Sequence, residues 1–525
     1  MGFNGAELGA EGPLIERETS YMVNARYSFL SILDAMGFQI AGTDGAVPTY
    51  QDMCSKVNIP LKTGTISWVT LLGANQIHSV SDFEDDTEWT PGDQGSDMEA
   101  KGKQLFTGMN YMHRFSRNTR LENRLSYQYF ESKIDQYKLN YPDGEKTPGY
   151  KGTSAEGRGS WHANLHHRIN SRHFFTSGTG IDLYMTDLNT TDKDIVLNNY
   201  RKNSALINGF VQWQYRLNEN ITFTPGVYGQ YYTLSRDYSI EPRLGMKMKI
   251  TPRTALSLGT GLYSQLQPRQ VYFYEVDGEL VNKSLEMSKS WQSVIGYDFK
   301  ISNNLRLKTE VFYQHLYHIP VIPDLPAESI LNFGDDYEND WNYIFQNKGK
   351  GRNYGLELTL ERFFNNNYYF LVTASLYDSR YKGYDEIERH TKFAGNHTLN
   401  TLFGYEWKLK KGRLLSLNAK VSWMGGKRYL PMSMEHEGGD IMYDYTQAYS
   451  EHLPDYFRCD LNFNMKKNYR KFSLEWFVEL NNITNHKNLW IKYYNANRGQ
   501  EEKIYQYSFM PIGGCKLYFQ SSRKK

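Results

Sequence analysis

The chain contains only three cysteines in 525 residues, at positions 54, 459 and 515. They form no Cys-x-x-Cys pair and are too scattered for a disulfide framework, so a cysteine-based metal knuckle or redox motif is excluded. No run of 18 uninterrupted apolar residues occurs, which excludes a helical membrane protein. A secretory leader is also not evident, because Met1–Asn4 enters Gly-rich alternating sequence without a basic or apolar region.

The net charge of the chain is close to zero. The 60 Lys and Arg residues nearly balance 58 Asp and Glu residues, and the formal charge is +2. This balance argues against a nucleic-acid binder that works through bulk charge. Aromatic residues are abundant, with 42 Tyr, 27 Phe and 10 Trp. Such a content is not typical of a disordered chain, so a folded protein is expected.

The dominant pattern is an alternation of apolar and polar residues with period two. It is clear over Ala205–Leu217, where Ile, Val, Trp and Tyr occupy odd positions, and it recurs over Leu305–Tyr317 and Phe472–Leu480. This period predicts β-strands with one apolar and one polar face. A soluble β-sandwich shows the same alternation, so the pattern alone does not choose between the two classes.

The lengths of the connections favour one class. Short polar turns are expected at 62–64, 116–118, 170–172, 218–220, 303–304, 365–367, 410–412 and 469–470. Long irregular segments are expected between them, at 29–49, 81–98, 140–154, 188–202, 268–282, 320–345, 383–392, 430–451 and 486–503. A transmembrane β-barrel alternates short periplasmic turns with long extracellular loops in this way, whereas a sandwich does not. The sequence therefore predicts an all-β protein, a large transmembrane antiparallel barrel.

Strand length and number agree with a large barrel. Met98–Phe115 and Arg120–Tyr137 exceed the 9–11 residues that cross a bilayer at a tilt. We count about 21 strands, and both Phe3–Gly12 and Ile504–Phe519 run toward the short turns. Because a closed barrel has an even number of strands, we expect one more strand ahead of Met1, about 22 in all, with no plug domain in this chain. The expected barrel covers residues 1–519, and a polar tail covers 520–525.

Several segments add a family resemblance through their order and spacing. They are Gly5–Pro13, Tyr21–Phe29, Pro48–Asp52, Gly351–Leu358, Gly425–Tyr429, Tyr456–Leu461, Leu480–Asn485 and Tyr505–Phe519. Together they resemble the barrel of TonB-dependent outer-membrane receptors that carry a carboxypeptidase-regulatory-like domain and a plug upstream. The resemblance implies a Gram-negative outer-membrane receptor for a bulky scarce nutrient, here an N-terminally truncated one. Its ligand would be a siderophore, corrinoid, glycan or peptide.

The resemblance also implies partners. These are outer-membrane lipid, the barrel-assembly machinery and, only through the missing N-terminal region, the TonB complex. In the family the closing strand carries the signal for membrane insertion. The corresponding lipid-facing residues here would be Tyr505, Tyr507, Phe509, Leu517 and Phe519. Family members usually stop at the terminal aromatic residue, whereas six residues follow Phe519 in this chain.

Candidate ligand residues are aromatic side chains with nearby acids, a combination that suits sugars or cationic chelates. They are Trp89, Asp335, Asp336, Trp341 and Tyr343. An interfacial girdle or simple packing between loops is the alternative role for them. No metal site is predicted: His162 and His166 fall on a strand and lack the Glu of the zinc motif. No cofactor site is predicted, and no nucleophile, base and orienting group assemble, so an enzyme is not predicted.

Two other functions compete with the receptor. A plug-less barrel would act as a passive outer-membrane porin, although an open barrel of this size would be a wide leak. A soluble β-rich glycan-binding protein would explain the missing leader, but the regular alternation of short and long connections speaks against it.

Overall fold

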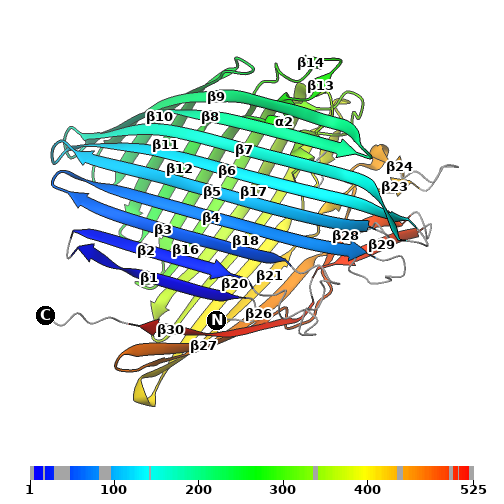
Figure 1. The fold of residues 1–525 in the computed structure, drawn as a ribbon. Coiled ribbons are helices and arrows are strands. Elements are labelled where there is room, and N and C mark those ends of the chain that lie inside the picture. Colours follow the sequence, from blue (N-terminus) through cyan, green and yellow to red (C-terminus); the bar gives the residue numbers. More distant parts are fainter. Residues whose placement is uncertain are drawn as a thin grey trace.

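The computed structural model describes residues 5–15, 18–28, 48–81, 96–140, 144–334, 341–433, 442–495, 500–506 and 508–519. Its main element is one antiparallel sheet of 22 strands, which curls into a barrel (Figure 1). No helix in the described part of the chain is long and apolar enough to cross a membrane. The predicted all-β class and antiparallel barrel are confirmed.

The elements are as follows. The sheet contains β1 (Ala6–Ile15), β2 (Thr19–Tyr27), β3 (Thr49–Leu61), β4 (Gly64–Ser81), β5 (Ser96–Arg114), β6 (Thr119–Asn140), β7 (Glu145–Arg168), β8 (His173–Asp192), β9 (Ile195–Arg216), β10 (Ile221–Tyr232), β11 (Tyr238–Thr251), β12 (Thr254–Gln265), β15 (Ser288–Lys300), β16 (Leu305–Val321), β17 (Gln346–Asn365), β18 (Tyr368–Lys382), β19 (Glu388–His390), β20 (His397–Leu409), β21 (Arg413–Met424), β26 (Tyr456–Asn468), β27 (Phe472–Asn481) and β30 (Met510–Phe519). Outside it lie α2 (Arg269–Tyr272), β13 (Glu275–Val276), β14 (Glu279–Leu280), η1 (Ile330–Asn332), η2 (Lys410–Gly412), β22 (Arg428–Tyr429), β23 (Met432–Ser433), β24 (Met442–Tyr443), η3 (Tyr445–Gln447), β25 (Glu451–His452), β28 (Leu489–Asn495) and β29 (Gln500–Tyr505).

The long strands form a simple meander in which each pairs with the next along the chain. β19 has three residues and pairs only with β18, so 21 of the 22 strands form the meander. This agrees with the expected count of about 21. With an odd number of strands, β1 and β30 point toward the same end of the barrel (Figure 1). Among the described strands, no pairing joins β1 to β30, and both are edges of the sheet.

Three segments expected to be long irregular loops, 140–154, 188–202 and 486–503, consist largely of strands in their described residues. The pairing of β6 with β7 extends to Asn140–Glu145, inside the expected loop 140–154. β8 and β9 are joined by the two-residue turn Lys193–Asp194, both with positive φ, inside the expected loop 188–202. The sequence alternation fades there because both faces of a strand that projects beyond a membrane are polar. The backbone ladder nevertheless continues, because it does not depend on which side chains the strand carries.

The closing strand is shorter than expected. The sequence pattern places one strand over 504–519, but β30 begins at Met510, and Tyr505 ends β29. Tyr505 pairs with Leu489 of β28 in a separate hairpin. The alternation runs through both elements without a break, so only the pairing partners distinguish the hairpin from the barrel strand.

The two faces of the sheet differ sharply in chemistry. Ile295, Val311, Leu356 and Leu376 are cross-strand neighbours on β15–β18 and are 58%, 55%, 41% and 61% exposed. The next positions, on the opposite face, are Gly296, Glu310, Glu357 and Ser375, which are paired in the same order. Exposed apolar side chains on the outside and polar ones inside are the arrangement of a barrel in lipid with an aqueous lumen.

Candidate ligand mouth and lumenal wall

Connections at one end of the barrel pack into an apolar cluster, here called the mouth cluster. It joins the segments 266–287, 322–334 and 341–345 to the ends of β8 and β10. Its buried members are Tyr184, Tyr232, Val271, Tyr272, Leu285, Met287, Ile322 and Phe345. Because residues from these connections and from the wall share one core, the connections are held against the strands rather than free in solvent.

The predicted ligand residues fall partly at the edge of this cluster. Trp341 and Tyr343 pack against it, with ring centroids 5.7 Å and 6.3 Å from that of Phe333. Both are half-buried. Trp89, Asp335 and Asp336 lie outside the described residues. Of the two roles considered for Trp341 and Tyr343, the described contacts are those of packing between loops, and contact with a ligand stays a prediction.

A second apolar cluster joins the connection after β16 to the one after β21. Ala327, Tyr381, Ala448 and Tyr449 are its buried members. At its centre the Tyr449 hydroxyl donates to the Glu328 carboxylate, 3.1 Å from each oxygen. Burial raises the pKa of Glu328, because the charged form loses its water and the hydrogen bonds only partly offset that loss.

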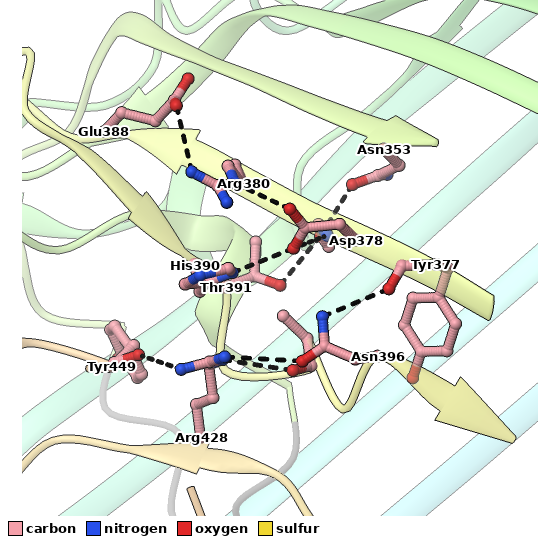
Figure 2. A network of polar contacts seen from close by, with 12 residues as sticks. Asn353, Tyr377, Asp378, Arg380, Glu388, His390, Thr391, Asn396, Arg428 and Tyr449 are labelled. Atoms are coloured by element: carbon pink, nitrogen blue, oxygen red, sulfur yellow. Dashed lines mark hydrogen bonds and ion pairs between the residues drawn. The ribbon is translucent and has the colours of Figure 1, made fainter. Parts of the chain in front are cut away.

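Arg428 ties the same region together through backbone carbonyls (Figure 2). Its Nη1 donates to the carbonyls of Ser450 at 2.9 Å and Tyr449 at 3.3 Å. Its Nε donates to the carbonyl of Ala394 at 3.2 Å. One side chain therefore joins the connection that precedes β20 to the one that precedes β26.

The lumen-facing wall beneath the mouth cluster carries charge. Arg269 of α2 forms an ion pair with Glu156 of β7, and its guanidinium lies 4.8 Å from the ring centroid of Tyr184. Arg158 approaches the same ring at 5.5 Å. The short helix is thus anchored on the inside of the barrel, and the segment that contains it lies over the lumenal wall.

Asp182 of β8 is the centre of one polar network on this wall. Its side chain is 2% exposed and receives Arg158 Nη2 at 2.9 Å. Ser160 Oγ donates at 2.5 Å, and a ring nitrogen of His162 lies 3.2 Å away. The alternation around Trp161 predicts that 158, 160 and 162 share a face, but only the strand register shows that Asp182 is their common partner.

Glu241 of β11 is the centre of a second network. It is fully buried and accepts hydrogen bonds from Ser239 Oγ at 2.7 Å, Gln230 Nε2 at 3.1 Å and Arg243 Nη2 at 2.5 Å. The Arg243 guanidinium lies 4.3 Å from the ring centroid of Tyr263. Nothing in the spacing of these residues distinguishes them from other polar strand positions, so the sequence analysis missed them.

The wall as a whole presents charges of both signs beside tyrosine rings. Three arginines, at 158, 243 and 269, face three acids, at 156, 182 and 241. The Nε atoms of Arg243 and Arg269 are buried and have no hydrogen-bond partner among the described residues. The guanidinium groups are the more exposed part of this surface, since the side chains of Arg158, Arg243 and Arg269 are 39%, 38% and 23% exposed, whereas Asp182 and Glu241 are buried. In the described part of the chain, no group of three or more His, Cys, Asp or Glu side chains is arranged to hold a metal ion.

The comparison with known families decides which fold family this is. A family profile described as "TonB dependent receptor-like, beta-barrel" matches residues 58–483, well over half of the chain. The chain belongs to the TonB-dependent receptor family. Within this TonB-dependent receptor barrel, the match begins near the end of β3 and ends just after β27. β1 and β2 precede the matched part in the same sheet, and β30 follows it.

Solved structures agree in fold at low sequence identity. The ferric preacinetobactin receptor BauA from Acinetobacter baumannii is 10% identical with a TM-score of 0.69, covering 98% of this chain and 77% of its own. The pyoverdine receptor FpvA from Pseudomonas aeruginosa PAO1, bound to pyoverdine, is 12% identical with a TM-score of 0.71, covering 98% and 77%. The Escherichia coli outer-membrane transporter YddB is 11% identical with a TM-score of 0.67, covering 98% and 75%. A sequence comparison with curated proteins found no match.

Proposed function

We propose that this TonB-dependent receptor barrel resides in the outer membrane and imports a bulky hydrophilic nutrient through its lumen. The observation that supports the proposal is the packing of connections at one end of the barrel onto a charged lumenal wall. The band of exposed apolar side chains on the outside of the barrel suits a lipid environment. A soluble protein would not expose such a band of apolar side chains to water. In a passive pore the passage through the lumen stays open, whereas here connections at one end pack against the wall.

The chemistry of that wall favours one ligand class among those considered. Paired arginines and acids beside tyrosine rings suit a large ligand rich in oxygen donors. Ferric siderophores have that character, and two of the similar structures are a ferric preacinetobactin receptor and a pyoverdine receptor. We therefore place a ferric siderophore ahead of a corrinoid, glycan or peptide.

Binding in lipid nanodiscs tests this proposal. The purified chain is titrated with ferric pyoverdine, ferric enterobactin, cyanocobalamin and a maltodextrin while tryptophan fluorescence is recorded. Arg158→Gln removes a lumenal guanidinium of the wall, and we expect affinity for the ferric ligand to fall about tenfold, the equivalent of about 1.4 kcal/mol. Arg306→Gln is the matched control, because Arg306 also pairs with a lumenal aspartate, Asp298, but near the short turns.

The alternatives predict different outcomes. Equal loss in both variants, or no binding by any ligand, would contradict a ligand site at the mouth. A large, steady, ligand-independent conductance in planar bilayers would favour the passive porin. Identical gel migration before and after boiling would favour the soluble β-protein, since a folded barrel migrates differently from the unfolded chain.

A further inference from the structure

The outward face of β15–β18 changes character in rows as it leaves the lipid band. Above the exposed Ile295, Val311, Leu356 and Leu376 lies a row formed by Ser293, Tyr313, Tyr354 and Asp378. The next row, still outward, is Trp291, His315, Arg352 and Arg380, extended by His390 of β19. This order, from aliphatic to tyrosine to cation, follows a wall that passes from acyl chains through the interface to headgroups.

Cations dominate the outward face above the tyrosines. The four strands place Lys289, Lys350, Arg352, Arg380 and Lys382 there, against the single acid Asp378. Because Lys350 and Lys382 are direct cross-strand neighbours, two like charges oppose each other. Glu388 of β19 is the cross-strand neighbour of Lys382 on the other side, so one anion lies beside this pair, but its carboxylate is engaged by Arg352 and Arg380.

The acids nearby do not neutralise this excess of positive charge. Glu388 of β19 lies 2.7 Å from Arg352. Its carboxylate also lies 3.5 Å from Arg380, and Asp378 accepts from Arg380 Nε at 2.8 Å (Figure 2). These contacts hold both guanidinium groups in position. Lys289, Lys350 and Lys382 form no ion pair with any residue that the structure describes, and Arg352 Nε is buried without a hydrogen-bond partner in that same part of the chain.

A groove of about 530 Å³ runs along the upper part of β16 and β17. Its lining is His315, Tyr317, His318, Asn347, Lys348, Gly349 and Lys350. A bulge creates it: the register shifts between Leu316 and Ile319, where His318 has a φ of 57°. The groove gives the cationic face a concave surface instead of a flat one.

The wall of β5 and β6 provides a contrast at the corresponding position above its own lipid band. Its outward lysines are balanced, since Lys101 lies 2.6 Å from Glu99 and Lys103 lies 3.7 Å from Glu131. The two remaining outward charges of that region are Lys133, opposite Lys101, and Asp135, opposite Glu99, so three cations are matched by three acids. The outward face of β15–β19 therefore carries five Lys and Arg residues against the two acids Asp378 and Glu388, an excess of cations that the wall of β5 and β6 does not have.

We propose that the outward face of β15–β18 binds the phosphate-bearing headgroup of a lipid in the surrounding leaflet. Lys289, Lys350 and Lys382 supply charge to the phosphate, and Arg352, held by Glu388, offers its remaining donors to phosphate oxygens. The tyrosine and apolar rows below contact the acyl chains of the same lipid. The site lies on the outside of the barrel, so it is separate from the cargo site and stands whether or not the cargo proposal holds.

Short-chain lipids in detergent solution test the proposal. Dihexanoyl phosphatidic acid is titrated into the purified chain, with dihexanoyl phosphatidylcholine and inorganic phosphate as competitors, and binding is followed by microscale thermophoresis. We expect phosphatidic acid to bind in preference to phosphatidylcholine, and inorganic phosphate to compete poorly because it lacks the chains.

Three triple variants locate the site. Lys289→Gln, Lys350→Gln and Lys382→Gln together should weaken phosphatidic acid binding at least about tenfold, while the same three positions changed to Arg should retain it. Lys101→Gln, Lys103→Gln and Lys133→Gln are the matched control and should change it less than about twofold. Heat-modifiable gel migration shows that each variant is folded. Equal loss in the control, no preference over phosphatidylcholine, or equal competition by inorganic phosphate would each overturn the proposal.

Discussion

At the scale of single residues, the buried carboxyl of Glu328 is expected to make a local contact depend on pH. It lies between two connections at the mouth, buried against Tyr449. Its raised pKa means that the folded contact favours the protonated carboxyl. The stabilisation is therefore complete at pH below the ordinary range of a glutamate and is lost as pH rises through the raised value.

Glu328→Gln should remove this pH dependence, because an amide is neutral at every pH and its oxygen still accepts from Tyr449. In the unmodified chain, we expect amide exchange in residues 445–455, corrected for intrinsic rate, to become faster as pH rises from 4 toward neutrality. In the variant the protection should stay nearly constant. Glu275→Gln, on the exposed strand β13, serves as control; if it flattened the profile equally, Glu328 would not be the responsible group.

At the scale of elements, each strand is defined by which face its residues occupy. Leu356 and Glu357 are neighbours on β17, yet the first pairs with Val311 and the second with Glu310. The period-two pattern predicts this difference correctly. Continued backward from Tyr354, the same pattern places Arg352 and Lys350 outward, so the signal for the cationic face was present in the sequence, although its meaning required the neighbouring strands.

Leu356→Arg should lower the free energy of unfolding by about 2–4 kcal/mol, the cost of a cation on the lipid face near the middle of a bilayer. Glu357→Arg, one position along, should change it by less than about 1 kcal/mol, because it faces the lumen beside Glu310. Urea unfolding in lipid vesicles, followed by tryptophan fluorescence, measures both. Similar losses from the two variants would show that β17 does not separate lipid from lumen.

At the scale of the whole molecule, the three cysteines are distributed over the two faces of the barrel wall. Cys459 and Cys515 are outward, paired with Val421 and Trp476. Cys54 lies on the lumen face, opposite Asn24. None of them forms a disulfide.

In vesicles, a water-soluble maleimide should therefore label Cys54, whereas Cys459 and Cys515 should react only with a maleimide that dissolves in lipid. Mass spectrometry of the labelled peptides distinguishes the three sites. Unfolding in detergent and urea should make all three react with the water-soluble reagent, which is the control for intrinsic reactivity. Equal labelling of all three in intact vesicles would contradict the membrane-spanning arrangement.

The sequence by itself determined the class of fold, the number of strands to within one and the orientation of their faces. These features can be predicted because alternation and turn spacing are local. The apolar and polar residues within each strand show which face lies toward lipid and which toward water. The resemblance in motif order then predicted the family that the profile match confirmed.

Only the tertiary structure decided what depends on pairing between distant strands. The tall ends of the β6–β7 and β8–β9 pairs, the separation of β29 from β30 and the Asp182 and Glu241 networks all follow from register, which no local pattern encodes. The same is true of the cationic face, where Trp291, His315, Arg352 and Arg380 are far apart in the chain and become one row through backbone hydrogen bonds. The apolar or polar character of the side chains determines which face of a strand is buried in lipid. The register of the backbone hydrogen bonds between strands determines which side chains become neighbours.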